Sequence, residues 1–329
     1  NEKILISRGD LMLMLATIMD YFLEHDVNHE YELIAVGNRK TSFFEEYFHI
    51  PYIQMNIVNK EEFSKLPKEN VHAVVDLAGY MPARSDGDYT EKMLNVNLMG
   101  TLNILNYCVD VKADRILFAQ SFGDILPHAA NYPTLTVNLP RTFGMNTDHT
   151  VYLIAKCAAV DLIEYYHQHY GLKRFIFRLP TIYLYAKDRY FYRDGQKTTL
   201  WYRVLIDKAI AGEDMEVWGD PTKVKDMVYV KDFAQLLYLG TIVDRDSGFY
   251  NVGTGVGTSL QEQFEVMAEV LRGEKKSKIS YRPDMPSTGE YVMDITPAIK
   301  ELGYKPKYDY KSFLLDYKKE MESGRFDSL

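Results

Sequence analysis

The amino-acid sequence predicts an α/β protein with a doubly wound parallel sheet and a smaller α/β region in its carboxyl-terminal part. In the first half of the chain, short apolar runs alternate with longer segments of helical periodicity. This alternation is typical of strands that helical crossovers join into one parallel sheet. After about residue 183 the pattern becomes irregular, with short strands, aromatic loops and helices. That change predicts the smaller second region.

The expected elements follow from apolar periodicity. Residues 3–7 (KILIS) and 71–77 (VHAVVDL) are continuous apolar runs of the kind found in strands that are buried on both faces. Further strands are expected at residues 31–36, 52–56, 115–121 and 173–179. Helical periodicity predicts helices over residues 10–25, with Asp10 as the N-cap, and over residues 89–109 and 150–169.

The composition is that of an ordinary soluble globular protein and excludes several function classes. In the 329 residues, 38 Lys and Arg against 46 Asp and Glu give a net charge of −8, which argues against a surface that binds nucleic acid. Cys108 and Cys157 cannot form a disulfide framework, and no cysteine–histidine cluster has zinc spacing. The longest apolar run, residues 11–19, is shorter than the ~20 residues of a membrane helix. With no signal-peptide pattern, we expect a cytoplasmic protein without metal, membrane or nucleic-acid partners.

Tyr152 and Lys156 are one helical turn apart and therefore share one face of their predicted helix. An ammonium group close to a phenol favours the phenolate, lowers the pKa of the phenol from its usual ~10 and suits it to act as a general base. The spacing alone is weak evidence, because the chain has 26 tyrosines and a second such pair occurs at Tyr183 and Lys187. A surface tyrosine beside a solvated lysine is the alternative for an isolated match.

Neighbouring motifs place this pair in a wider pattern. The strand at residues 115–121 ends in Ser121, at the edge where open α/β sheets bind ligands. Its hydroxyl can donate to a substrate oxygen while Tyr152 handles the proton. The run VVDLAG at residues 74–79 leads into a turn of small residues, which lets a flat ligand approach the backbone. Asn97 has two compatible interpretations, a residue beside the ligand and a buried side chain that anchors its helix.

Together these stretches resemble the extended short-chain dehydrogenase/reductase family, specifically its nucleotide-sugar epimerase/dehydratase branch. VVDLAG, NLMGTLNIL, RILFAQS, YLIAK and FRLPTIY occur in family order, followed by VWGDPTKVKDMVYVKDFAQ, YNVGTG with SLQEQ, and DITPAIKELGYKP. The resemblance implies a Rossmann-type dinucleotide-binding domain over residues 1–180. It also implies a mainly substrate-binding domain over residues 181–329, with part of residues 226–255 returning to the first domain.

The resemblance further implies a site and a reaction. Ser121, Tyr152 and Lys156 occupy the catalytic positions, where Tyr152 exchanges a proton with a sugar hydroxyl while hydride passes to or from a nicotinamide cofactor. Thr181 and Lys225 stand at substrate-contacting positions, and Arg282 lies close to a third. The implied cofactor-binding residues are Arg8, Gly9, Asn38, Arg39, Asn56, Ile57, Leu77, Ala78, Gly79, Asn97, Lys156, Leu179 and Pro180.

The chain departs from the family pattern after its first strand. The three glycines of the family's Gly-x-x-Gly-x-x-Gly turn fall on Arg8, Leu11 and Met14, and only Gly9 is nearby. Such glycines let the backbone reach a pyrophosphate at the helix N-terminus. Either the charge of Arg8 replaces those donors, or the dinucleotide lies farther out or does not bind. The basic pair at positions 39 and 40 suits a 2′-phosphate, so NADP is preferred to NAD if either binds; a solvated basic turn is the alternative.

Two functional hypotheses follow. In the first, the chain is an NADP- or NAD-dependent enzyme that acts on a nucleotide-activated sugar by epimerisation, reduction or dehydration; dehydration is less favoured because Asp124 is the only carboxylate beside Ser121. In the second, it is a non-catalytic family descendant without cofactor, acting as a binding or assembly module. The family's dimer helices correspond to residues 89–109 and 150–169 and imply a homodimer, in which Tyr107, Tyr165 and Tyr166 lie either at the interface or in the core.

Overall fold

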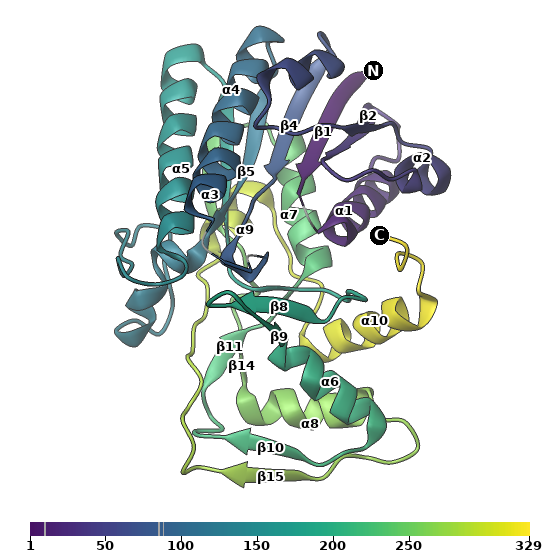
Figure 1. Ribbon diagram of the computed structural model, residues 1–329, viewed down its shortest axis with the longest axis vertical. Helices are drawn as coiled ribbons and strands as arrows, with labels where there is room; N and C mark the ends of the chain where they lie inside the picture. The colour runs from purple at the N-terminus through teal and green to yellow at the C-terminus, as the bar shows by residue number, and fades with distance from the viewer. Residues whose placement is uncertain (10, 85, 88) are drawn as a thin grey trace.

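A parallel sheet forms the upper part of the molecule in Figure 1. The computed structural model describes residues 1–9, 11–84, 86–87 and 89–329. Within them, the sheet contains β1 (Glu2–Arg8), β2 (Tyr31–Gly37), β3 (Tyr52–Gln54), β4 (Val71–Leu77), β5 (Arg115–Ser121), β6 (Lys173–Leu179) and β13 (Ser247–Asn251). Their order is β13-β6-β5-β4-β1-β2-β3, and every neighbouring pair is parallel. The order reverses between β1 and β4, the place where doubly wound sheets bind ligands.

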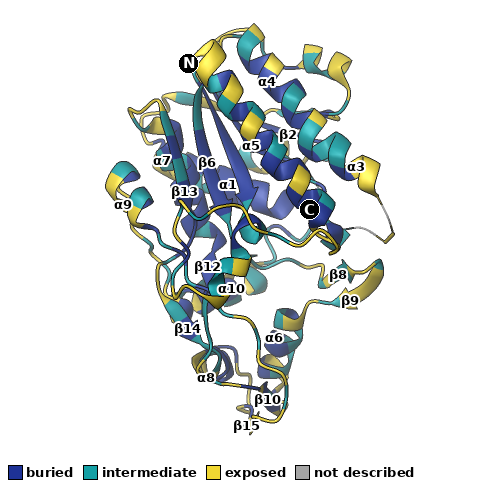
Figure 2. Cartoon of the chain, turned by 90° about the vertical axis from the view of Figure 1, so that its left-hand side faces the viewer, coloured by how far each residue is buried: buried dark blue, intermediate teal, exposed yellow. Residues whose placement is uncertain are grey.

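Two helical layers cover the sheet (Figure 1). One layer contains α3 (Thr90–Leu94), η3 (Asn95–Met99), α4 (Gly100–Asp110) and α5 (Thr150–Tyr170), and the other contains α1 (Met12–His25) and α7 (Val230–Ile242). Successive side chains of a strand point to opposite faces. In β1, Ile4 and Ile6 accordingly join the core beneath α1, whereas Leu5 joins the core beneath α4 and α5. This two-sided burial, visible in Figure 2, explains the continuous apolar runs.

The rest of the chain forms the lower part of the molecule and several connections (Figure 1). Its strands pair two by two as β7 (Ile182–Tyr183) with β12 (Val228–Tyr229), β8 (Tyr190–Arg193) with β9 (Gln196–Thr199), β10 (Met215–Trp218) with β15 (Ile279–Arg282), and β11 (Val224–Asp226) with β14 (Gly257–Ser259). Its helices are α6 (Trp201–Ala211), α8 (Leu260–Val270) and α10 (Tyr310–Ser323), whereas α9 (Thr296–Leu302) lies beside β13 and α7. The short helices α2 (Phe43–Phe48), η1 (Lys60–Lys65), η2 (Pro82–Arg84), η4 (Phe122–Asp124) and η5 (Leu126–Ala130) complete the described elements.

The predicted α/β fold is confirmed, and three local expectations need correction. The first helix begins at Met12, after Leu11 and without a side-chain cap, and the expected cap Asp10 lies outside the described residues. The strand expected over residues 52–56 ends at Gln54. The helix expected over 89–109 begins at Thr90 and contains the π-helical turn η3, which inserts the wider turn that carries Asn97. α7 and β13 lie within residues 226–255 and join the sheet layers, while the domain boundary at residue 180 stays a prediction.

Candidate active site

Ser121, Tyr152 and Lys156 lie at the carboxyl ends of the central strands. Ser121 ends β5, and its Oγ accepts a hydrogen bond of 3.2 Å from the backbone N–H of Gly123, which caps η4. Tyr152 and Lys156 lie on the inner face of α5, with 8% and 3% of their surfaces exposed. A Cβ atom at Gly123 would lie 2.9 Å from the Leu153 side chain and 3.4 Å from Ser121 Oγ. The serine loop therefore packs directly against the first turns of α5.

Lys156 is buried between α5 and the end of β5. Its Nζ donates a hydrogen bond of 2.9 Å to the carbonyl oxygen of Ala119 and lies 4.5 Å from the centre of the Phe118 ring. It also lies 3.9 Å from where a Cβ atom at Gly79 would be. Burial lowers the pKa of Lys156 to about 8; Asp76 opposes this fall and Arg8 adds to it. The Lys156 ammonium therefore loses its proton more readily than that of a solvated lysine.

The expectation of a lowered phenol pKa is wrong for Tyr152 in this structure. Burial raises the pKa of Tyr152 to about 12, and the cation that opposes the rise is Arg8. The physical reason is geometric, because Lys156 Nζ is drawn to Ala119 and lies 5.9 Å from the centre of the Tyr152 ring. Within the described residues, only one of the three ammonium N–H groups is bonded, which leaves two for a ligand.

Arg8 takes a defined place at the lost glycine position. Its Nη1 donates a hydrogen bond of 2.7 Å to the carbonyl oxygen of Leu77, so the guanidinium spans from β1 to β4 across the switch point of the sheet. Gly9 and Gly79 approach each other closely, since a Cβ atom at Gly9 would lie 3.2 Å from Gly79 O. Met14 is only 4% exposed and belongs to the core beneath α1. This bulky side chain therefore packs into the core.

The other expected cofactor residues fall into two groups. Ala78 and Leu77 are buried at the end of β4, and Leu179 and Pro180 follow at the end of β6. Asn97 is 1% exposed and holds both backbone groups of Tyr80, accepting from its N–H at 3.1 Å and donating to its carbonyl at 2.6 Å. Of its two interpretations, the structure supports the anchoring role.

The residues expected at the adenine end are mostly exposed. Asn38 and Arg39 follow β2 on the surface, where their carbonyl oxygens accept hydrogen bonds from Gln54 and Tyr52. Asn56 is exposed and uses its side-chain oxygen for its own turn, accepting from Val58 N at 3.0 Å. Ile57 is buried in the core beneath α4. These bonds fix the shape of the edge without using the basic side chain of Arg39.

On the substrate side, the structure brings Lys225 but not Arg282 to a cavity. Lys225 lines a cavity of about 220 Å³ together with Trp218 and Tyr183, and burial lowers the pKa of its ammonium group. Arg282 is exposed, is not among the residues that line this cavity, and is bonded to Asp284 at 2.8 Å. Thr181 is exposed between β6 and β7. Lys225 is thus the cation best placed for an anionic ligand.

Three features of the site were not predicted from the sequence: the burial of Asp76, the ion pair of Asp124 and the place of Tyr291. Asp76 is fully buried beside Lys156. A charged residue within the apolar run VVDLAG was the feature of the sequence that could have indicated this buried carboxylate. Asp124 is paired with Arg178 at 2.9 Å, with 1% and 4% of their side chains exposed, so this carboxylate is committed to a buried ion pair. The ring of Tyr291 packs on Phe122, next to Ser121, and its buried hydroxyl makes no regular hydrogen bond within the described residues. The sequence contains no local pattern that predicts the ion pair of Asp124 or the place of Tyr291.

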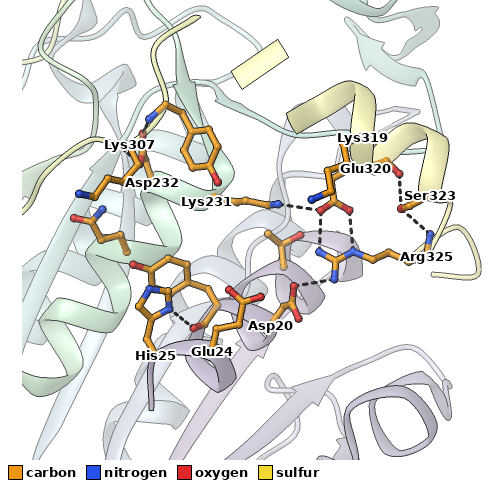
Figure 3. Close-up of a pocket in the computed structure, with 14 residues that line it drawn as sticks. Asp20, Glu24, His25, Lys231, Asp232, Lys307, Lys319, Glu320, Ser323 and Arg325 are labelled. Atoms are coloured by element: carbon orange, nitrogen blue, oxygen red, sulfur yellow. Dashed lines mark hydrogen bonds and ion pairs between the residues drawn. The ribbon is translucent and has the colours of Figure 1, made fainter. Parts of the chain in front are cut away.

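A separate cavity of about 460 Å³ lies between α1, α7 and α10 and contains none of the expected site residues (Figure 3). Several of its charges compensate one another: Glu320 accepts from Lys231 at 2.9 Å and from Arg325 at 2.8 Å, and Arg325 also contacts Asp20 at 2.8 Å. In the described residues, no cluster of His, Cys, Asp and Glu could hold a metal ion, and no helix is long and apolar enough to cross a membrane.

Comparison with known proteins gives a consistent result. The family model described as the NAD dependent epimerase/dehydratase family matches residues 16–253. The chain is 26% identical over 273 residues to a Methanocaldococcus jannaschii protein described as a candidate UDP-glucose 4-epimerase, which covers 79% of this chain and 80% of that protein. It is 24% identical over 249 residues to GDP-L-fucose synthase 1 of Arabidopsis thaliana, with 74% of each chain covered.

Solved structures resemble the fold over almost the whole chain. UDP-glucose 4-epimerase of Thermotoga maritima, solved with UDP-glucose, has a TM-score of 0.73 at 21% identity and covers 97% of this chain and 99% of that one. UDP-glucose 4-epimerase of Thermus thermophilus, solved with NAD, has a TM-score of 0.71 at 21% identity and covers 96% and 99%. At these identities the likeness establishes the fold.

Proposed function

The chain belongs to the NAD-dependent epimerase/dehydratase family, and from this premise we propose that it is an NAD(P)-dependent enzyme that acts on a nucleotide-activated sugar. The observation that carries the proposal is the placement of Tyr152 and Lys156, buried on α5 against the ends of β4 and β5, beside the loop of Ser121. A phenol, an ammonium group and a hydroxyl at the switch point of a doubly wound sheet form a proton-transfer site where this fold binds ligands.

The residues divide the work by their chemistry. Tyr152 exchanges a proton with a sugar hydroxyl, and Ser121 donates a hydrogen bond to the same region of the substrate. Because burial raises the Tyr152 pKa to about 12, the phenol needs cations nearby to lose its proton at neutral pH. Arg8 is the cation that already acts on the phenol. Lys156 would be the second when a ligand is bound, since its two unbonded N–H groups can reach a ligand hydroxyl. NAD(P) supplies the hydride acceptor and donor when it is bound.

The residues at the switch point fit a dinucleotide. Three residues separate the end of β1 from the first turn of α1, which contains no acidic side chain, so the partial positive charge of the helix N-terminus would favour a pyrophosphate. Arg8 adds a full charge at the same end, and Lys156 would hold the ribose next to the nicotinamide. The preference for NADP rests on the exposed basic pair at positions 39 and 40, and titration with both cofactors tests it.

Lys225 and its cavity support a nucleoside diphosphate as the carrier of the sugar. The cavity is lined by aromatic side chains, Trp218 among them, that suit a base, and it holds a buried cation for the phosphates. Two of the similar structures were solved with UDP-glucose or NAD. Because Asp124 is held in its buried pair with Arg178, it is not free to act as the acid of a dehydration. Epimerisation or reduction is the reaction that the site favours.

Titration calorimetry tests this proposal. The protein should bind at least one of NAD, NADH, NADP or NADPH with a dissociation constant below about 1 mM, and turnover should follow with UDP-glucose or another nucleotide sugar. A protein that binds none of the four cofactors contradicts the proposal. Absorbance of a copurifying reduced nicotinamide would support it directly.

A non-catalytic binding module is the second candidate, and two observations favour it. The glycine loop is lost, and the Tyr152 pKa is far above neutral pH. Ligand binding separates the two candidates, since a module without cofactor should bind a nucleotide sugar or a protein partner but no nicotinamide.

We infer a homodimer from the outer face of α5. Tyr107 and Tyr166, two of the three tyrosines considered, are buried in the core, whereas Tyr165 and Ile154 are 53% and 43% exposed. If α5 faces a second copy, Ile154→Asp should convert a dimer to a monomer in light scattering, and a monomeric parent protein contradicts this inference.

A further inference from the structure

Asp76 is a buried carboxylate without enough neutral partners. It lies in β4 with 0% of its surface exposed. One oxygen accepts from Ala78 N at 3.2 Å and the other accepts from Thr101 Oγ at 3.0 Å. An ionised carboxylate can accept about four hydrogen bonds, and its burial is costly unless a cation compensates it. Two neutral donors leave most of that cost uncompensated, and burial raises the pKa of Asp76. Asp76 therefore stays ionised at neutral pH only if a nearby cation compensates its charge.

The sheet register brings Asp76 and Lys156 to the same place. Asp76 pairs with Phe118 across β4 and β5, and residues that pair in this way project to the same face of the sheet. Lys156 Nζ lies over the ring of that same Phe118, at 4.5 Å from its centre, and bonds to the next residue, Ala119. The carboxylate and the ammonium group therefore share one buried compartment between the sheet and α5.

The charges acting on this compartment are few. Asp76 opposes the fall in the pKa of Lys156, and Lys156 is the strongest influence that opposes the rise of the Asp76 pKa. Arg8, from β1, acts on both groups and on Tyr152, the titratable neighbour on α5. Cys108, from α4, faces Asp76, and burial raises the pKa of its thiol. Asn97 and Thr101 on the same side are neutral. Asp76 is thus the anion that acts on Lys156.

We propose that Asp76 is a positioning residue that keeps Lys156 charged between the sheet and α5 at neutral pH. This proposal rests on the proposed function, in which Lys156 takes part, and it adds Asp76 to the residues of that site. Without the Asp76 carboxylate, the buried Lys156 ammonium, which lies near Arg8, would lose its proton at a lower pH. Lys156 would then no longer supply the positive charge that Tyr152 needs in the proposed reaction. A fall of the Lys156 pKa from 8 to 7 would reduce the charged fraction at pH 7.5 from about three quarters to about one quarter.

The test is a direct titration of Lys156 by NMR in protein labelled with ¹³C at the lysine ε carbons. The Lys156→Met variant identifies the resonance by its loss. In the Asp76→Asn variant, which keeps the shape of the side chain, the Lys156 midpoint should fall by about one pH unit or more. The matched control is Asp232→Asn, because Asp232 is also fully buried but lies on α7 across the sheet. It should leave the midpoint unchanged. An unchanged midpoint in folded Asp76→Asn protein overturns the proposal.

A reciprocal measurement covers the case in which Asp76→Asn does not fold. In protein labelled at the aspartate carboxyl carbons, the Asp76 midpoint should be higher in Lys156→Met than in the parent protein, since two coupled groups shift each other equally. Equal midpoints in the two proteins also overturn the proposal. Both readouts are independent of turnover, so an inactive protein would refute the proposed enzyme while the Asp76 assignment stands or falls on the titration.

Discussion

The ammonium nitrogen of Lys156 lies 2.9 Å from the carbonyl oxygen of Ala119 and 5.9 Å from the centre of the Tyr152 ring. Tyr152 and Lys156 share a face of α5, yet the lysine bonds to the backbone of β5 and not to the phenol. This arrangement leaves the Tyr152 pKa raised by burial. In the proposed reaction, loss of the phenolic proton would therefore require a ligand that brings the ammonium and the phenol together, with Arg8 as the second cation.

Replacement of Tyr152 by Phe should abolish turnover and leave the fold intact. The change removes the hydroxyl that we propose transfers the proton, but keeps the ring that packs beside Tyr80 and Leu153. We expect the turnover number to fall by about two orders of magnitude or more, with little change in cofactor affinity. Steady-state kinetics and cofactor titration measure the two effects. Unchanged turnover in this variant would exclude Tyr152 as the proton-transfer residue.

The buried charge of Lys156 should make stability depend on pH. Its pKa in the folded protein is about 8, below the 10.5 of the unfolded chain. The ammonium therefore destabilises the folded protein fully below pH 8, and this cost is relieved as the pH rises towards 10.5. Relative to Lys156→Met, the free energy of unfolding of the parent protein should rise by about 2 kcal/mol between pH 7 and 10. Urea unfolding at several pH values measures this difference, and parallel pH profiles would contradict it.

The α/β fold and most strands and helices of the first half could be predicted because burial on both faces leaves a plain pattern in the sequence. The order of the strands in the sheet was not predicted and comes from the structure. Residues 71–77 and 173–179 are strands with the predicted limits, since their apolar runs are read by local rules alone. The site could be predicted only as a set of positions. The bond from Lys156 to Ala119, the pair of Asp124 with Arg178 and the placement of Asp76 join residues 37, 54 and about 80 positions apart. Their contacts depend on tertiary packing that no local pattern encodes.

The pair of Asp124 and Arg178 should be essential for stability. Its two hydrogen bonds, of 2.9 and 3.0 Å, tie the helical turn after Ser121 to β6 in a buried site. Arg178→Met leaves the carboxylate buried without its partner, which should lower the free energy of unfolding by about 3 kcal/mol. The Arg178→Met/Asp124→Leu double variant should recover part of that loss.

An exposed pair provides the control for this stability experiment. Arg141 and Asp161 lie 2.8 Å apart with 37% and 67% of their side chains exposed. Arg141→Met should therefore cost less than about 1 kcal/mol. Urea unfolding measures all three variants. Equal losses in Arg178→Met and Arg141→Met would show that the buried pair has no special role.

Lys225 should control affinity for a nucleoside diphosphate. It lines the aromatic cavity of about 220 Å³, and burial lowers its pKa, so an anion that enters the cavity gains a poorly solvated cation. Lys225→Ala should weaken the binding of UDP about tenfold or more, which corresponds to ~1.4 kcal/mol. The control is Lys223→Ala, because Lys223 is one residue from β11 and already paired with Glu290 at 3.2 Å. The affinity of the Lys223→Ala variant for UDP should stay within about twofold of the parent value. Calorimetry with UDP measures both variants, and equal effects would remove Lys225 from the binding site because general surface charge would then explain the affinity.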